Sequence, residues 1–135
     1  MKVFILLITT IFLTACATSV GLQKTSQYKL SSPADERAKL IYDTAKQCWS
    51  KDAGFFDGWG TIVSSNVSLE GIEISARWVP LVETHEQAPF IRIVISEFQN
   101  ASVVEIYEKP HFYVGKDQVH HDAVRWAKGN YTCST

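Results

Sequence analysis

Residues 72–79 read Ile-Glu-Ile-Ser-Ala-Arg-Trp-Val, and this stretch decides the fold because apolar and polar residues alternate along it. Successive side chains of a β-strand point to opposite faces of a sheet, so the pattern predicts a strand with one buried face and one face in water. Such strands are typical of antiparallel sheets. The buried side comprises Ile72, Ile74, Ala76 and Trp78, and the wet side comprises Glu73, Ser75 and Arg77.

Three further strands are predicted around this one. Residues 61–67 precede it as a hairpin partner, and residues 90–98 and 102–108 follow it. The link from Pro80 to Pro89 is too short and too polar to contain a crossover helix. The four strands are therefore predicted to form an antiparallel meander.

An amphipathic helix is predicted before the strands. Ser32 is expected as the N-cap, Pro33 as the first helical residue, and Asp35 lies near the positive end of the helix dipole. Apolar residues then recur at helical spacing. They are Ala34, Ala38, Ile41, Ala45 and Cys48.

A second helix is predicted after the strands, from about Lys116 to a stop at Gly129 and Asn130. Ala123 and Trp126 lie on its apolar face. The order of elements predicts an α+β fold, a four-stranded antiparallel meander with both helices packed on one face.

The N-terminal segment has the features of a secretory signal. Lys2 precedes an apolar run from Val3 to Leu13, which is shorter than the roughly twenty residues that a membrane-spanning helix needs. The run closes with Leu13-Thr14-Ala15-Cys16, which resembles the lipobox of bacterial lipoproteins. The resemblance implies cleavage before Cys16 and attachment of diacylglycerol and a further acyl chain, such as palmitate, to Cys16.

The same resemblance implies a location. Ala17, where an acidic residue often signals inner-membrane retention, implies sorting to the outer membrane, with the domain facing the periplasm. Residues 1–15 are then the signal peptide, 16–31 a flexible tether, and 32–135 a single domain. An ordinary signal peptide and an uncleaved short anchor are the alternatives.

Two cysteines remain once Cys16 is lipidated. In an oxidising compartment, Cys48 and Cys133 are expected to form a disulfide that closes nearly the whole domain. The alternative is a pair of free thiols. A catalytic Cys48 is disfavoured because it falls at the end of the predicted helix, whereas activated thiols favour helix N-termini.

Charge and composition exclude some partners and cofactors. Removal of Lys2 with the signal peptide leaves twelve of the thirteen basic side chains against fourteen acidic ones, and no basic face is visible. Nucleic acid is therefore not expected as a partner. His111, His120 and His121 lack the spacing of three or four that helical metal ligands need, so no metal or other cofactor is expected.

The stretch from Phe55 to Trp59 is the most unusual part of the predicted domain. Its aromatic residues beside Asp57 are either a platform for a sugar, peptide or lipid tail, or a plug at one end of the core. The candidate binding residues are Phe55, Phe56, Asp57 and Trp59.

No catalytic residues are assigned. Glu73, Glu97, Glu105 and Glu108 fall on strand faces predicted to be solvated, and no nucleophile motif is present. The leading interpretation is a non-enzymatic, lipid-anchored envelope protein that binds another envelope component, expected to be a protein, with a sheet edge available for strand addition. A binding module for cell-wall glycan or a small amphiphile is the alternative, and a small periplasmic hydrolase is the third.

Overall fold

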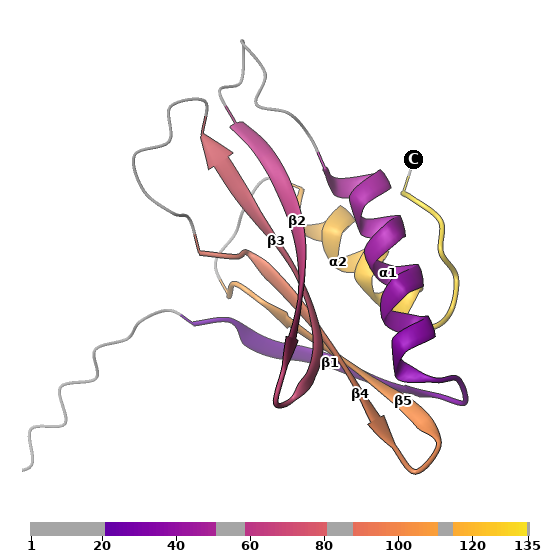
Figure 1. Ribbon diagram of the computed structural model, residues 1–135. Coiled ribbons are helices and arrows are strands. Elements are labelled where there is room, and N and C mark those ends of the chain that lie inside the picture. Colours follow the sequence, from indigo (N-terminus) through magenta and orange to yellow (C-terminus); the bar gives the residue numbers. More distant parts are fainter. Residues whose placement is uncertain (1–20, 51–58, 81–87, 111–114, 135) are drawn as a thin grey trace, which may run out of the picture.

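The computed structural model describes residues 21–50, 59–80, 88–110 and 115–134 (Figure 1). All five strands belong to one antiparallel sheet in the order β1-β5-β4-β3-β2. The α+β class and the antiparallel sheet are confirmed, whereas the predicted number of four strands is wrong. The elements are β1 (Gln23–Leu30), α1 (Ala34–Trp49), β2 (Trp59–Ser68), β3 (Gly71–Pro80), β4 (Ile91–Phe98), β5 (Ala101–Glu108) and α2 (Lys116–Ala127).

The unpredicted strand is β1, which lies within the segment expected to be a tether. Its pattern was too weak to predict a strand, because Tyr28 and Leu30 are its only large apolar residues. It forms because β5 offers an edge, where Tyr28 pairs with Val104 and Leu30 with Ser102. Backbone hydrogen bonds to β5 therefore order this segment, and Tyr28 also packs against the core. The prediction of a flexible tether is wrong for Gln23–Leu30.

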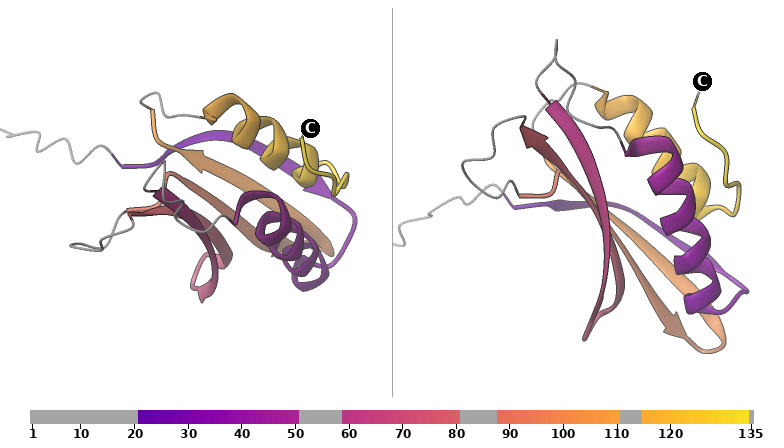
Figure 2. Two further views of the ribbon diagram at one scale, coloured as in Figure 1. Left: turned by 90° about the horizontal axis from the view of Figure 1, so that it is seen from above. Right: turned by 45° about the horizontal axis from the view of Figure 1, so that its top comes forward.

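The two helices cover the same face of the sheet (Figures 1 and 2). The stripe of α1 packs through Ile41 and Ala45, both fully buried, and α2 contributes Trp126. Trp49 of α1 meets Trp126 with ring centroids 4.5 Å apart, so the helices also contact each other. Neither of these described helices has the length and hydropathy that crossing a bilayer requires.

The inner face of the sheet supplies the other half of the core. Cross-strand partners lie side by side across β3, β4 and β5, where Ile74 pairs with Ile93 and Ile93 with Ile106. All three are at most 1% exposed. The alternation that predicted the strands therefore places their apolar residues under the helices, as expected.

The start of α1 differs from its prediction in one detail. The helix begins at Ala34, its cap position is Pro33, and no side chain caps it. The Ser32 hydroxyl instead accepts hydrogen bonds from the Arg37 guanidinium, at 3.1 Å from Nε. Arg37 therefore uses the side chain that was expected to cap the helix.

The two hairpins close tightly. Gln99 and Asn100, between β4 and β5, have φ angles of 52° and 61°, as the two central residues of a type I′ turn require. Gly71 opens β3 with a φ of 141°, and a Cβ atom there would collide with the backbone carbonyl of Ile95. Glycine is therefore needed where β3 first approaches β4.

Candidate functional site

The predicted site residues are only partly described by the structure. Cys16 and the loop residues Phe55, Phe56 and Asp57 lie outside the described residues. Trp59 is the first residue of β2, which lies at one edge of the sheet. The choice between a binding platform and a core plug therefore stays a prediction.

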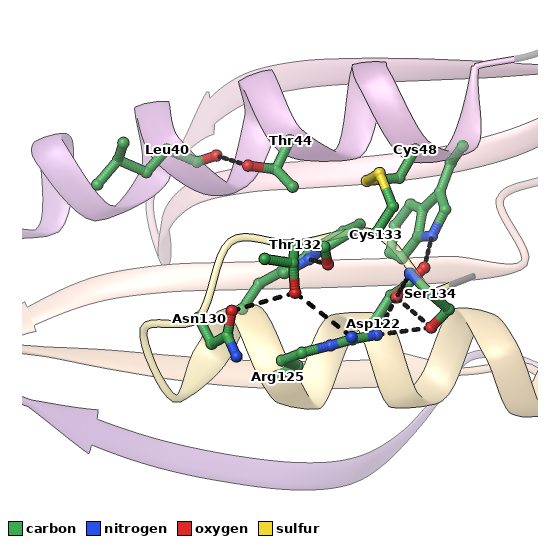
Figure 3. Close-up of a disulfide and its surroundings, with 11 residues drawn as sticks. Leu40, Thr44, Cys48, Asp122, Arg125, Asn130, Thr132, Cys133 and Ser134 are labelled. Carbon is green, nitrogen blue, oxygen red and sulfur yellow. Dashed lines mark hydrogen bonds and ion pairs between the residues drawn. A yellow bond between two sulfur atoms is a disulfide. The ribbon is translucent and has the colours of Figure 1, made fainter.

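Cys48 and Cys133 form the disulfide that the sequence predicts (Figure 3). Cys48 lies near the end of α1, and Cys133 lies in the segment that follows α2. The Cα atoms are 5.4 Å apart, although 85 residues separate the cysteines along the chain. The bond therefore fastens the C-terminal segment to α1.

A buried carboxylate supports this cross-link. Asp122 of α2 is 1% exposed, and its Oδ1 accepts hydrogen bonds from the backbone N–H of Ser134 at 2.8 Å and from the Ser134 hydroxyl at 2.6 Å. Arg125 pairs with the same oxygen at 2.6 Å, and the Trp49 indole donates to Oδ2 at 3.2 Å. Because both oxygens are satisfied by the protein, this carboxylate is a structural hub.

A second buried carboxylate contradicts the sequence-based prediction. Glu108, predicted to lie on a solvated strand face, is 2% exposed and faces the helices. Its Oε2 accepts a hydrogen bond from the Thr25 hydroxyl at 2.8 Å and lies 2.7 Å from His120 Nδ1. A bulge between Lys24 and Ser26 accompanies the approach of Thr25. Glu108 therefore joins β1 and α2 to β5.

The histidines are not arranged as metal ligands in the part of the chain that the structure describes. His120 is oriented by Glu108, and the ring of His121 lies edge-on at 5.9 Å from the His120 ring. No group of three or more His, Cys, Asp or Glu side chains in the described segments could hold a metal ion. The Oε1 atom of Glu108 is buried without a hydrogen-bond partner among these residues.

The outer face of the sheet carries a charged cluster over β1 and β5. The Lys24 ammonium donates to Glu105, and this hydrogen bond is the main cause that lowers the pKa of Glu105 and raises that of Lys24. The Tyr107 hydroxyl donates to the same carboxylate at 3.0 Å, and burial raises the pKa of Tyr107. This side of the sheet is therefore stabilised by polar contacts between neighbouring strands.

The β1 edge has the features that natural proteins use against unwanted strand pairing. It contains Lys24 and Lys29, and the bulge after Lys24 interrupts its regular hydrogen bonding. Edge lysines and bulges both discourage a further strand from adding to a sheet. The edge of residues 102–108, exposed in the predicted meander, is thus covered by a protected strand.

The β2 edge at the other side of the sheet lacks these features. The ten residues from Trp59 to Ser68 include no charged residue and no proline. Ile62 is 44% exposed, and Val67 and Leu69 at the hairpin end are 78% and 108% exposed. A long, uncharged edge of this kind is a template for pairing with another strand. The sequence predicts an available sheet edge but not which one. Because β1 covers β5, the available edge is that of β2.

Comparisons with known proteins give no guide to function, because no protein-family model, curated protein or solved structure matches this chain.

Proposed function

We propose that this chain is a non-enzymatic bacterial lipoprotein, anchored in the outer membrane through acyl chains on Cys16, whose domain binds another envelope protein at the β2 edge. The lipobox, Leu13 to Cys16, is the basis for the anchor and the location. The unprotected β2 edge is the observation that carries the binding function.

Strand addition suits this edge for a physical reason. An incoming extended segment gains backbone hydrogen bonds from every second residue of β2, which gives affinity without a preformed pocket. Serine and asparagine side chains on β2 present no charge that has to be desolvated or neutralised. The exposed Val67 and Leu69 at the end of the same hairpin offer apolar area to a partner that extends that far.

The proposed anchor adjoins β1 in the sequence, not β2. The lipid-bearing segment precedes β1, and β1 and β2 are the two opposite edges of the sheet (Figure 2). Four strand spacings of roughly 4.8 Å separate them, about 19 Å in all. A partner can therefore reach β2 without displacing the strand that leads to the membrane.

The binding proposal is tested by a photo-crosslinking residue in place of Ser64, on the outer side of β2, in intact cells. The matched control replaces Gln27, an exposed residue on the outer side of β1. The expected result is a discrete heavier protein adduct from position 64 and none from position 27. Equal or absent adducts at the two positions would reject binding at this edge.

The anchor is tested separately by Cys16→Ser. Mass spectrometry of the wild-type chain should find an acylated Cys16 at the mature amino terminus, and the variant should remain unacylated and uncleaved at that site. An unmodified Cys16 in the wild-type protein would contradict the proposed lipid anchor and location, whatever the crosslinking result.

A further inference from the structure

We infer that the partner at the β2 edge is a second copy of this chain, paired antiparallel through β2 to give one continuous sheet across two domains. The inference rests on the proposed function, because it names the protein that the β2 edge binds. It follows from the hydrogen-bond geometry of the edge and from the residues that the edge presents.

The backbone of β2 decides which residues can pair. Ser68 pairs with Gly71 across a two-residue turn, and the residues that close such a turn exchange backbone hydrogen bonds. Because bonding alternates along an antiparallel pair, the even-numbered residues of β2 bond to β3. The N–H and C=O groups of the odd-numbered residues then face the free edge, which is the edge that no other described strand covers.

This alternation restricts how two copies can meet. Odd-numbered residues of one copy must stand opposite odd-numbered residues of the other, which also keeps the helix-covered faces on the same side. One such register places Ser64 opposite Ser64 of the second copy, on the two-fold axis. The neighbouring pairs, each formed twice, are Val63 with Ser65, Ile62 with Asn66, and Thr61 with Val67.

The residues on the edge suit this self-pairing. No like charges meet, since β2 contains none, and small hydroxyl side chains lie at the centre of the pair. Val67 is 78% exposed in the single chain and receives Thr61 of the second copy beside it. No charge therefore opposes self-pairing along β2, and Val67 gains a contact from it.

The two-fold pair gives a sharp test with the full lipidated chain in intact cells. Residues opposite each other without hydrogen bonds have Cα atoms about 4.5 Å apart, within the range that a disulfide spans. Ser64→Cys should therefore form a disulfide-linked dimer, recognised by a crosslinked peptide in which the substituted positions of two chains are joined. Gln27→Cys on the β1 edge is the matched control and should stay monomeric.

A second variant distinguishes a dimer formed by strand pairing from a disulfide formed by random collision of two chains. Ser65→Pro removes an N–H group that faces the free edge and that β3 does not use, as edge strands tolerate. Added to Ser64→Cys, it should abolish the crosslinked dimer while a cooperative thermal transition shows that the domain is still folded. An unchanged dimer yield in the folded double variant would overturn the inference.

The outcomes also separate this inference from the proposed function. Adducts from position 64 that contain only other proteins would overturn self-pairing and leave envelope-protein binding at β2 in place. No adduct from either the cysteine or the photo-crosslinking residue at position 64 would overturn both.

Discussion

The indole nitrogen of Trp49, the last residue of α1, donates a hydrogen bond to the buried carboxylate of Asp122 in α2, at 3.2 Å. The same carboxylate holds the backbone N–H and the hydroxyl of Ser134. Both helices and the segment that follows the disulfide therefore meet at one side chain. This arrangement fastens the two helices to each other and to the C-terminal segment.

Asp122→Ala should lower the free energy of unfolding by about 2–3 kcal/mol, because the buried Trp49 N–H and the Ser134 N–H lose their acceptor. Urea unfolding with the disulfide intact measures the change. Asp117→Ala, at an exposed position in the first turn of the same helix, is the control and should cost only a few tenths of a kcal/mol. Equal effects of the two substitutions would contradict the role of Asp122 as a hub.

Replacing both Cys48 and Cys133 by alanine should lower the free energy of unfolding by about 4–5 kcal/mol. In the chain-entropy model this is the contribution of a bond that closes a loop of this length, with a sequence separation of 85. Urea unfolding of the double variant checks the value. Alkylation of the native, unreduced wild-type protein supplies the control, and labelling of both thiols would show that no bond exists.

His120→Ala should destabilise the domain by about 1–3 kcal/mol, because Glu108 then keeps Thr25 as its one hydrogen-bond donor among the described residues. The neighbouring His121→Ala is the matched control, since His121 is exposed on the same helix. Chemical unfolding at neutral pH compares the two variants. If they are equally stable, the contact between His120 and Glu108 contributes nothing.

Glu105→Gln should destabilise the domain slightly at neutral pH and not at low pH. The hydrogen bond from Lys24 lowers the pKa of Glu105 in the folded state below the ordinary value of 4.5. A carboxyl group whose pKa is lowered in the folded state stabilises the fold at pH values above its unfolded-state pKa. That stabilisation is lost as the pH falls through the folded-state pKa. Urea unfolding of variant and wild type at neutral pH and near pH 3 measures the difference.

Glu97→Gln, at an exposed site on β4, is the control for this pH dependence. Between neutral pH and pH 3, its effect on the free energy of unfolding should vary less than the effect of Glu105→Gln does. A stability loss from Glu105→Gln that is as large in acid as at neutral pH would contradict the charged contact with Lys24.

Much of the fold could be predicted because its elements have strong hydrophobic periodicity. The alternation in residues 72–79 and the stripe of α1 each determine which face is buried. β1 could not be predicted in the same way, since its order depends on the edge of β5, a partner more than seventy residues away. Strand formation that relies on backbone pairing leaves little trace in side-chain pattern.

The site could be predicted less well. The disulfide followed from counting cysteines once Cys16 was set aside, and the structure contains it. The alternation along β5 places Glu108 on the same face as Ile106, but its burial depends on Thr25 of β1 and His120 of α2, which sequence reasoning did not place beside it. The β2 edge could not be identified from the sequence, because its position at the edge depends on the order of all five strands.

Pairing of the β2 edge in the proposed lipid-anchored protein is the central claim. Hydrogen exchange of the full chain in membranes isolated from the cells that produce it, followed in a peptide that covers residues 60–68, tests it most directly. We predict slow exchange at Thr61 and Val63 in the wild type, fast exchange in the folded Ser65→Pro variant, and no difference between the two proteins in β1. Equally fast exchange at Thr61 and Val63 in both proteins would contradict the claim.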